Sequence, residues 1–443
     1  MRVLVLVDGE HYPPVTRWGI EVARERGHDV IGALYVGGLE KIDATAPLEI
    51  GVPVRTAGPD RMAALGDAMD ALVPEAVLDL SDEPVLGYRE RMEMVAVALA
   101  RGVPYLGADF RFDPPLEGSP LPVPTLAVIG TGKRTGKTAI AGEAARVAAG
   151  RDLRPAIVAM GRGGPPEPQV APAGSVGLER LVELVRAGQH AASDYLEDAV
   201  TTGVTTVGAR RVGGGLAGAP FATNARAAAE RAAALRPGLV LLEGSGSSVP
   251  PVRWDAGILV VPADVPPEYL GGYLGPLRLL LSDLVVVTMA GSPTAGPDNL
   301  STLRSHVRRY LGDGRHIVTD FIPVPLRDVR GERVFFTTTA PGAVAARQVE
   351  HLETVEGCRV VGWSARLADR VGLTEDLDGA EGFDVLITEL KAAAVDVGVE
   401  WAMARGAEVV FVDNRAVVVE GDRDLDSALG EIVDLAVARG SER

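Results

Sequence analysis

Short apolar runs alternate with amphipathic stretches in the N-terminal part of this chain. The apolar runs are strand-sized, and the stretches between them repeat their apolar residues with the helical period. Strands that alternate with amphipathic helices predict a parallel sheet covered by helices on both faces. We therefore expect an α/β domain over residues 1–111. Its expected strands span 3–7, 30–36 and 76–80, and its expected helices span 16–26, 61–72 and 89–100.

A proline-rich stretch at 112–124 has no periodic pattern, which predicts a linker. The alternation resumes after it, so we expect two further α/β domains, over 125–330 and 331–443. No short-period internal repeat is present, which argues against solenoids and propellers. The expected strands span 125–129, 156–160, 239–242, 258–262, 284–288, 317–321, 334–337, 359–363, 385–390 and 409–412, and the expected helices span 139–149, 226–235, 343–352 and 392–405.

The composition narrows the class of protein. No apolar run approaches the roughly 20 residues of a membrane helix, and the N-terminus lacks the long apolar stretch of a secretory signal. Cys358 is the only cysteine, which excludes an intrachain disulfide and a zinc site built on cysteines. The net charge of −16 argues against a nucleic-acid partner, because a phosphate backbone needs a basic surface. We expect a cytoplasmic protein that binds neither a membrane nor a nucleic acid.

The strongest chemical signal is the glycine-rich loop GTGKRTGKT at 130–138, which follows an expected strand and precedes an expected helix. Glycines let backbone N–H groups turn inward toward phosphate oxygens, and the helix presents its positive end to the same anion. Lys137 is placed to reach the β- and γ-phosphates, and the Thr138 hydroxyl is placed to hold Mg²⁺. The expected nucleotide-binding residues are Gly130, Thr131, Gly132, Lys133, Arg134, Thr135, Gly136, Lys137, Thr138 and Ala139.

ATP is favoured over GTP as the nucleotide. Many GTPases read guanine with an Asn-Lys-x-Asp loop, and only four lysines occur in this chain. Outside the phosphate-binding loop, Lys41 lies upstream of it and Lys391 is followed by three alanines. Neither lysine therefore fits a guanine-reading loop.

The loop departs from the common spacing, because Thr131 stands where a strict Walker A motif has its first glycine. Gly-Thr-x-x-x-x-Gly-Lys-Thr resembles the loop of dethiobiotin synthetase and its relatives among the dimeric P-loop ATPases. In that group a small substrate is phosphorylated and phosphate is then expelled. The resemblance implies a P-loop core and a homodimer. Lys133 either adds positive charge at the γ-phosphate, in a catalytic role, or is a solvated loop lysine.

A second half of the nucleotide site is expected after the strand at 239–242, where the sequence continues Glu243-Gly-Ser-Gly-Ser-Ser. Open α/β sheets bind ligands at the carboxyl ends of their strands. The resembling synthetases carry Glu-Gly-x-Gly here with the glutamate on Mg²⁺, so Glu243 is the second expected metal ligand, unless it caps the next turn. Ser245 and the serines that follow it are expected to face an anion.

Several motifs together resemble the cyclic 2,3-diphosphoglycerate synthetase family. They are the segments VDGEHYPP at 7–14, AMGRGGPPEP at 159–168 and RVFFTTTAP at 333–341, with the phosphate-binding loop and the Glu243 loop between them. The resemblance covers nearly the whole chain, with the motifs in family order. It implies a small anionic substrate, 2,3-diphosphoglycerate, which ATP converts to the cyclic diphosphate with release of ADP and phosphate.

Such a reaction needs cations more than a general base, because phosphate monoesters are already nucleophilic anions. Arg162, flanked by Gly161, Gly163 and Gly164, is the best candidate for gripping a substrate phosphate, since the glycines allow close approach. Glu167 follows in the same motif. The pair Arg210 and Arg211 forms either a mobile lid over the site or a solvated pair.

The other substrate candidates have weaker signals. His190, with Asp194, Tyr195 and Glu197 after it, resembles synthetase segments that line the substrate side, but a polar helix face explains the pattern better. Asp8, Glu10 and His11 end the first expected strand and so lie at a ligand-binding edge. A structural turn explains these three residues equally well.

Two other functions stay open from the sequence. One is a related ATP-dependent ligase that acts on a small carboxylate. The other is a regulatory P-loop ATPase that switches through dimerisation. Metal-delivery switches carry histidine- or cysteine-rich clusters, and membrane-positioning ones end in a basic helix, whereas residues 425–438 here are acidic.

Overall fold

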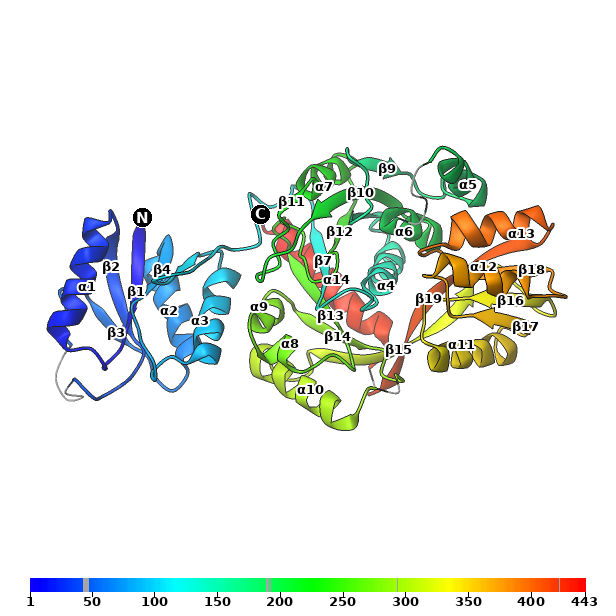
Figure 1. The fold of residues 1–443 in the computed structure, drawn as a ribbon. Coiled ribbons are helices and arrows are strands. Elements are labelled where there is room, and N and C mark those ends of the chain that lie inside the picture. The colour runs from blue at the N-terminus through cyan, green and yellow to red at the C-terminus, as the bar shows by residue number, and fades with distance from the viewer. Residues whose placement is uncertain (43–47, 189–190, 192, 293, 422) are drawn as a thin grey trace.

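The computed structural model describes residues 1–42, 48–188, 191, 193–292, 294–421 and 423–443. A small α/β unit lies at one end of the molecule and is joined by an extended segment to a large sheet that fills the centre and the other end (Figure 1). Most strand pairs are parallel, and helices cover both faces. The predicted α/β fold class is confirmed. Every helix of the described ranges is too short or too polar to cross a bilayer.

The N-terminal sheet contains six strands in the order β3-β2-β1-β4-β5-β6. Residues Val3–Val7 of β1 are buried without a break, as expected for a parallel strand covered on both faces. Alternate residues of β1 face α1 on one side and the α2 and α3 layer on the other. The elements are β1 (Arg2–Val7), α1 (Pro13–Glu25), β2 (Asp29–Tyr35), β3 (Val54–Thr56), α2 (Arg61–Leu72), β4 (Ala76–Asp79), α3 (Tyr88–Ala100), β5 (Tyr105–Leu106) and β6 (Arg111–Phe112).

The central sheet runs β11-β10-β8-β12-β7-β13-β14-β15 and has the phosphate-binding loop after β7. Its strands are β7 (Thr125–Gly130), β8 (Pro155–Gly161), β9 (Gln169–Ala171), β10 (Thr205–Val212), β11 (Ala222–Thr223), β12 (Leu239–Glu243), β13 (Ala256–Pro262), β14 (Leu284–Thr288) and β15 (His316–Pro325). Its helices are α4 (Lys137–Ala149), α5 (Leu178–Arg186), α6 (Asp194–Thr202), α7 (Ala225–Ala234), α8 (Glu268–Gly271), α9 (Gly275–Leu280) and α10 (Pro297–Leu311).

The C-terminal strands continue the same sheet, because β19 pairs antiparallel with β15 and the order goes on to β18, β16 and β17. β15 runs four residues past its expected end at 321, and β19 extends well beyond the expected 409–412. The remaining elements are β16 (Arg333–Thr337), α11 (Gly342–Thr354), β17 (Arg359–Ser364), α12 (Arg370–Asp378), β18 (Val385–Glu389), the π-helix η1 (Ala394–Val399), α13 (Glu400–Ala404), β19 (Glu408–Glu420) and α14 (Leu425–Ser441).

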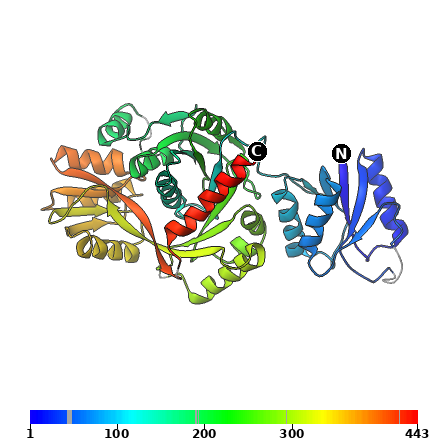
Figure 2. The same cartoon turned by 180° about the vertical axis from the view of Figure 1, so that it is seen from behind.

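The last helix returns to the central part of the molecule. Leu429, Ile432 and Val433 of α14 pack in one cluster with Ile140 and Ala144 of α4. Figure 2 shows α14 crossing in front of the central strands. The three-domain division predicted from the sequence stays an interpretation, but these contacts assign the final helix to the core around the phosphate-binding loop.

The expected helix at 392–405 is not one regular helix. Residues Ala394–Val399 form a π-helix, and a short α-helix, Glu400–Ala404, follows it. The Gly398 N–H donates to the Ala393 carbonyl, five residues back, at 3.2 Å. Valines alternating with other residues and a glycine have low α-helix propensity, which explains why this stretch departs from the α-helical pattern.

The N-terminal unit contacts the core through α3. Glu93 of α3 accepts from Arg309 at 2.8 Å and from the Tyr310 hydroxyl at 2.9 Å, both on α10. α3 also packs against α9. These contacts hold the N-terminal sheet on the far side of α9 from β7 and α4 (Figure 1).

Candidate active site

The glycine-rich loop joins β7 to α4, as predicted. Gly136 caps α4 at φ +88°, a conformation that favours glycine, and a Cβ there would collide with the Phe321 ring. The buried Lys137 side chain folds back over the loop and donates to the Gly132 carbonyl at 2.8 Å and to the Thr135 hydroxyl at 3.2 Å. The loop therefore places a lysine and a helix N-terminus at one point, the arrangement that binds nucleotide phosphates.

Two charged residues of the loop point outward. Lys133 and Arg134 are exposed at its tip, and Arg134 has φ +59°. The other predicted nucleotide-binding residues, 130–132 and 135–139, are buried or half-buried around the turn. The proposed catalytic role of Lys133 stays a prediction, and the structure places its side chain in solvent.

The predicted metal ligands lie side by side. The Thr138 hydroxyl donates to Glu243 Oε1 at 2.7 Å, and Glu243 ends β12 next to β7. Glu243 is 4% exposed, and in the described part of the chain its Oε2 has no hydrogen-bond partner. Burial raises the pKa of Glu243 to about 7, with a further rise from Asp194, while Thr138 and Lys137 oppose the shift. A buried carboxylate oxygen without a donor beside a hydroxyl fits a divalent cation.

A further buried carboxyl, Asp198 on α6, was not predicted. It is 0% exposed, and no N–H or O–H donor within the described ranges faces either oxygen. Burial, followed by the charges of Glu243 and Glu197, holds the pKa of Asp198 well above its usual range. Burial and these neighbouring charges therefore favour the protonated form of Asp198. The spacing of Asp194, Glu197 and Asp198, three and four residues apart, was the available signal that these side chains share one helix face.

Three cations meet this acidic group. Burial lowers the pKa of Lys137 to about 8, against the opposing charges of Glu243 and Asp194. Arg211 donates to the Ser245 carbonyl at 2.8 Å, and burial and the nearby Arg162 lower its pKa. A Cβ on the glycine after Ser245 would lie 2.8 Å from the Arg162 guanidinium and 3.1 Å from that of Arg211. The structure thus gathers the predicted Arg162, Arg211 and Ser245 beside Lys137.

The other predicted members of this group lie differently. Successive side chains of β10 point to opposite faces of the sheet, so Arg210 points away from Arg211. The Arg210 Nε donates to the Gly164 carbonyl at 3.2 Å. Gly163 and Glu167 are exposed in the loop after β8. His190 lies outside the described residues.

A cation from the C-terminal strands reaches the same helix face. Lys391, which follows β18, places its Nζ 3.3 Å from Glu197 Oε1. The charges of Glu197 and Glu389 raise the pKa of this lysine. Lys391 was not predicted as a site residue, because no local pattern reveals a contact between residues so far apart in the chain.

The predicted N-terminal candidates do not join this group. Asp8 accepts hydrogen bonds from the backbone N–H groups of Glu10, His11 and Asp82 and lies 2.8 Å from His11 Nδ1. It is buried at the end of β1, in a separate sheet (Figure 1). Within the single chain, Asp8, Glu10 and His11 form a turn of their own.

Comparison with solved structures gives distant matches. A crystal structure of LpxK from Aquifex aeolicus in complex with ATP aligns with a TM-score of 0.41 and 15% identity, over 72% of this chain and 91% of that one. A hydrogenase maturation factor HypB from Archaeoglobus fulgidus aligns with a TM-score of 0.29 and 12% identity, over 45% of this chain and 82% of that one. These scores are too low to support an argument about the site.

Comparison with protein families is much closer. Three family models match consecutive segments, namely the N-terminal domain (residues 2–113), the P-loop domain (125–319) and the C-terminal domain (325–415) of cyclic 2,3-diphosphoglycerate synthetase. The P-loop match supports nucleotide binding at the loop after β7.

Curated relatives of the same description cover nearly the full chain. Cyclic 2,3-diphosphoglycerate synthetase of Rubrobacter xylanophilus is 47% identical over 100% of this chain and 98% of its own length. Those of Methanothermobacter thermautotrophicus (41%; 98% and 97%) and Thermococcus kodakarensis (42%; 98% and 98%) match similarly. The chain therefore belongs to the cyclic 2,3-diphosphoglycerate synthetase family.

Proposed function

We propose that this chain uses ATP to close 2,3-diphosphoglycerate into its cyclic diphosphate, with release of ADP and phosphate. The observation that carries the proposal is the convergence of Lys137, Arg162 and Arg211 beside the Thr138–Glu243 pair. This arrangement offers several cations to a crowded set of phosphates at a nucleotide-binding loop. The names of the relatives supply the identity of the substrate.

The protein's residues divide the work. The loop after β7 and Lys137 hold the ATP phosphates, and Arg162 and Arg211 hold the substrate's two phosphates close together. Thr138 and Glu243 would hold Mg²⁺, which supplies positive charge to the phosphates when bound. Within the described ranges no three His, Cys, Asp or Glu side chains form a metal-binding group, so two protein ligands are proposed, and phosphate and water oxygens would complete the shell.

The bond changes balance without an additional reactant. A phosphate oxygen of the substrate attacks the γ-phosphorus of ATP, the bond to the β-phosphate breaks, and ADP leaves. The second substrate phosphate then attacks the inner phosphorus of the new anhydride, and inorganic phosphate leaves. Both attacking groups are phosphate anions, so the site needs orientation and charge more than a base. Holding the second nucleophile in the same molecule makes ring closure effectively unimolecular.

Phosphorus NMR tests this function. The purified chain with ATP, Mg²⁺ and 2,3-diphosphoglycerate should convert two monoester signals into anhydride signals while ADP and phosphate appear in equal amounts. ATP hydrolysis with unchanged 2,3-diphosphoglycerate would contradict the proposal and favour a nucleotide-driven switch. Conversion of a small carboxylate instead would favour the related ligase.

We also propose a homodimer and a cytoplasmic location. The dimer rests on the resemblance of the loop to the dimeric P-loop synthetases, and the location rests on the use of ATP and on the single cysteine. Light scattering at assay concentration measures the assembly. A fully active monomer would remove the dimer.

A further inference from the structure

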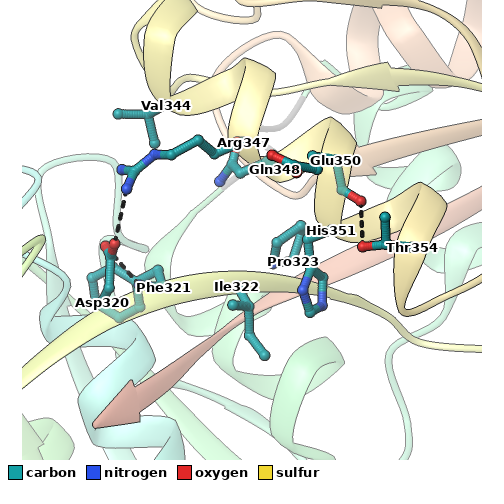
Figure 3. A pocket seen from close by; sticks show the side chains of 10 residues that line it. All are labelled: Asp320, Phe321, Ile322, Pro323, Val344, Arg347, Gln348, Glu350, His351 and Thr354. Carbon is teal, nitrogen blue, oxygen red and sulfur yellow. Dashed lines mark hydrogen bonds and ion pairs between the residues drawn. The ribbon is translucent and has the colours of Figure 1, made fainter. Parts of the chain in front are cut away.

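A pocket of about 280 Å³ lies between β15 and α11, where the C-terminal strands join the core (Figure 3). Apolar side chains of Phe321, Ile322 and Pro323 line it from β15, and Val344 lines it from α11. Arg347 and Gln348 add polar groups from α11. The volume is near the lower end of the range for small-molecule sites, which run from about 300 Å³ upward.

This pocket begins next to the phosphate-binding loop. Phe321 packs so closely on Gly136, the residue that caps α4, that a Cβ at Gly136 could not fit. In the sheet order β12 lies on one side of β7, whereas β13, β14 and β15 follow on the other side. Glu243 and Thr138 mark the first side as the place of the terminal phosphates. A nucleotide with its terminal phosphates on the first side has room for its nucleoside end on the other side, toward β15, where the pocket begins.

Two side chains of the pocket have a buried polar atom without a hydrogen-bond partner in the described ranges, Gln348 and His351, and the His351 Nε2 lies 3.7 Å from Glu356. Gln348 is 5% exposed, and in the part of the chain that the structure describes its amide oxygen accepts no hydrogen bond. A buried acceptor without a donor costs free energy, so such a group in a pocket points to a ligand that donates. Arg347 lies nearby, paired with Asp320 at 3.5 Å. Apolar walls with a few polar groups are typical of sites for an aromatic ring.

We propose that this pocket receives the adenosine end of ATP, with the Gln348 amide accepting a hydrogen bond from the exocyclic amino group of the base. Phe321 and Pro323 cover the base, and Arg347 lies at its edge. The inference rests on the proposed function for the phosphate loop, and it gives helix α11 of the C-terminal strands a direct part in nucleotide recognition. The Gln348 amide has both an acceptor oxygen and N–H donors. It therefore favours a purine with a hydrogen-bonding edge over an apolar ring.

Calorimetric titration with two probes tests this inference on the full-length protein in Mg²⁺. ADP reports on phosphates and nucleoside together, and inorganic tripolyphosphate reports on phosphates alone. Gln348→Leu and Arg347→Ala should each weaken ADP binding. The loss for Gln348→Leu should be about tenfold, because one hydrogen bond is lost and the amino group of the base is left without its acceptor. Tripolyphosphate binding should stay within about twofold of wild type. Arg359→Ala, at an exposed arginine of β17, is the matched control and should leave both affinities unchanged.

The outcomes separate the pocket from the phosphate loop. Unchanged ADP binding in both pocket variants, or an equal loss with both probes, would overturn the adenosine site. Lys137→Ala should weaken both probes, which shows that the assay detects the loop. If the pocket variants lose only ADP affinity but wild type forms no cyclic product, the adenosine site stands and the proposed function fails. Arg347 is half-exposed, so its variant keeps the test valid if Gln348→Leu does not fold.

Discussion

Two sheet edges in this molecule carry buried carboxylates after parallel strands, yet they differ in how far those groups are satisfied. In the N-terminal sheet Asp8 accepts three backbone N–H groups and contacts His11. Asp79, at the end of β4, accepts from Arg91 and from the Tyr105 hydroxyl, both at 2.9 Å. This edge supplies all the donors its carboxylates need.

The edge of the central sheet leaves comparable groups without partners. Glu243 Oε2, both oxygens of Asp198 and the Thr131 hydroxyl are buried and lack hydrogen bonds in the described segments. Buried polar groups of this kind are rare, and each costs about 1–3 kcal/mol. Position in the fold therefore does not distinguish a binding edge from a structural one. The two edges differ instead in how many of their buried polar groups have hydrogen-bond partners. The central edge is arranged for ligands, and the N-terminal edge is complete by itself.

The sharpest test of the central edge is Lys137→Ala. Removing the one buried ammonium of the loop should lower ATP turnover by about a thousandfold or more, because this charge faces the transferred phosphoryl group. The fold should be retained, since burial already lowers the pKa of Lys137 to about 8 and so disfavours its charged form. Coupled ADP release and thermal unfolding by circular dichroism measure the two effects. A folded variant with most of its activity would contradict the site.

Local signals predicted most of the long buried strands and the nucleotide loop, because a strand covered on both faces is a continuous apolar run and the loop needs its glycines and Lys137 in sequence. Long-range features could not be read in the same way. Lys391 reaches Glu197 only because β19 joins the C-terminal strands to β15, a pairing that periodicity does not specify. The different orientations of Arg210 and Arg211 follow from alternation in β10, a strand that the sequence analysis did not identify.

Glu243→Gln should produce the next largest effect. The amide keeps the size of the side chain but presents only one acceptor oxygen and no charge, so Mg²⁺-dependent turnover should fall by about a hundredfold. ADP binding measured in EDTA should change little. A variant with the wild-type Mg²⁺ requirement would assign the metal to another carboxylate, such as Asp194.

Arg162→Lys should impair use of 2,3-diphosphoglycerate while keeping the charge. Lysine cannot make the two parallel hydrogen bonds of a guanidinium. Loss of one charge-assisted bond costs roughly 1.5–3 kcal/mol, or about ten- to a hundredfold in kcat/KM for this substrate. The KM for ATP should change little in steady-state kinetics. Arg210→Lys is the matched control, because Arg210 points to the Gly164 carbonyl. A similar loss in that variant would show that the effect of Arg162→Lys is not specific to a bidentate grip on the substrate.

Asp8→Asn examines the other side of the comparison. The new amide group faces backbone N–H donors, so we expect a loss of about 1–3 kcal/mol in the free energy of unfolding of the N-terminal unit. ADP affinity should remain at the wild-type value. Urea unfolding and calorimetric titration measure these quantities. Unchanged stability with weakened 2,3-diphosphoglycerate binding would make the N-terminal edge a substrate site and remove the contrast between the two edges.

The smallest effect is expected at Lys391, which links the C-terminal strands to the central edge. Burial raises the pKa of Glu197 to about 8, above its ordinary 4.5, and Lys391 opposes that rise. Below pH 8 Glu197 is therefore mainly protonated in the folded protein, and its attraction to Lys391 contributes little there. Above pH 8 the carboxylate forms. Its raised pKa means that its contribution to stability is complete below pH 4.5 and is lost as the pH rises through 8.

Lys391→Met removes the opposing charge, so the pKa of Glu197 should rise further and the loss of stability should grow between about pH 6 and about pH 9. At the higher pH we expect Lys391→Met to lower the free energy of unfolding by about 1–2 kcal/mol. This is less than the roughly 3–5 kcal/mol lost when a fully buried pair is broken, because 38% of the Lys391 side chain is exposed. Lys391 also faces Glu389, whose pKa is lowered, so that carboxylate is ionised at both pH values. Loss of this second contact should lower the free energy of unfolding by a similar amount at both pH values. Urea unfolding of wild type, Lys391→Met and the charge-preserving Lys391→Arg at both pH values measures the difference. A loss in Lys391→Met that does not depend on pH would show that Lys391 acts through Glu389 alone, and the C-terminal strands would then have no charge contact with the central edge through Glu197.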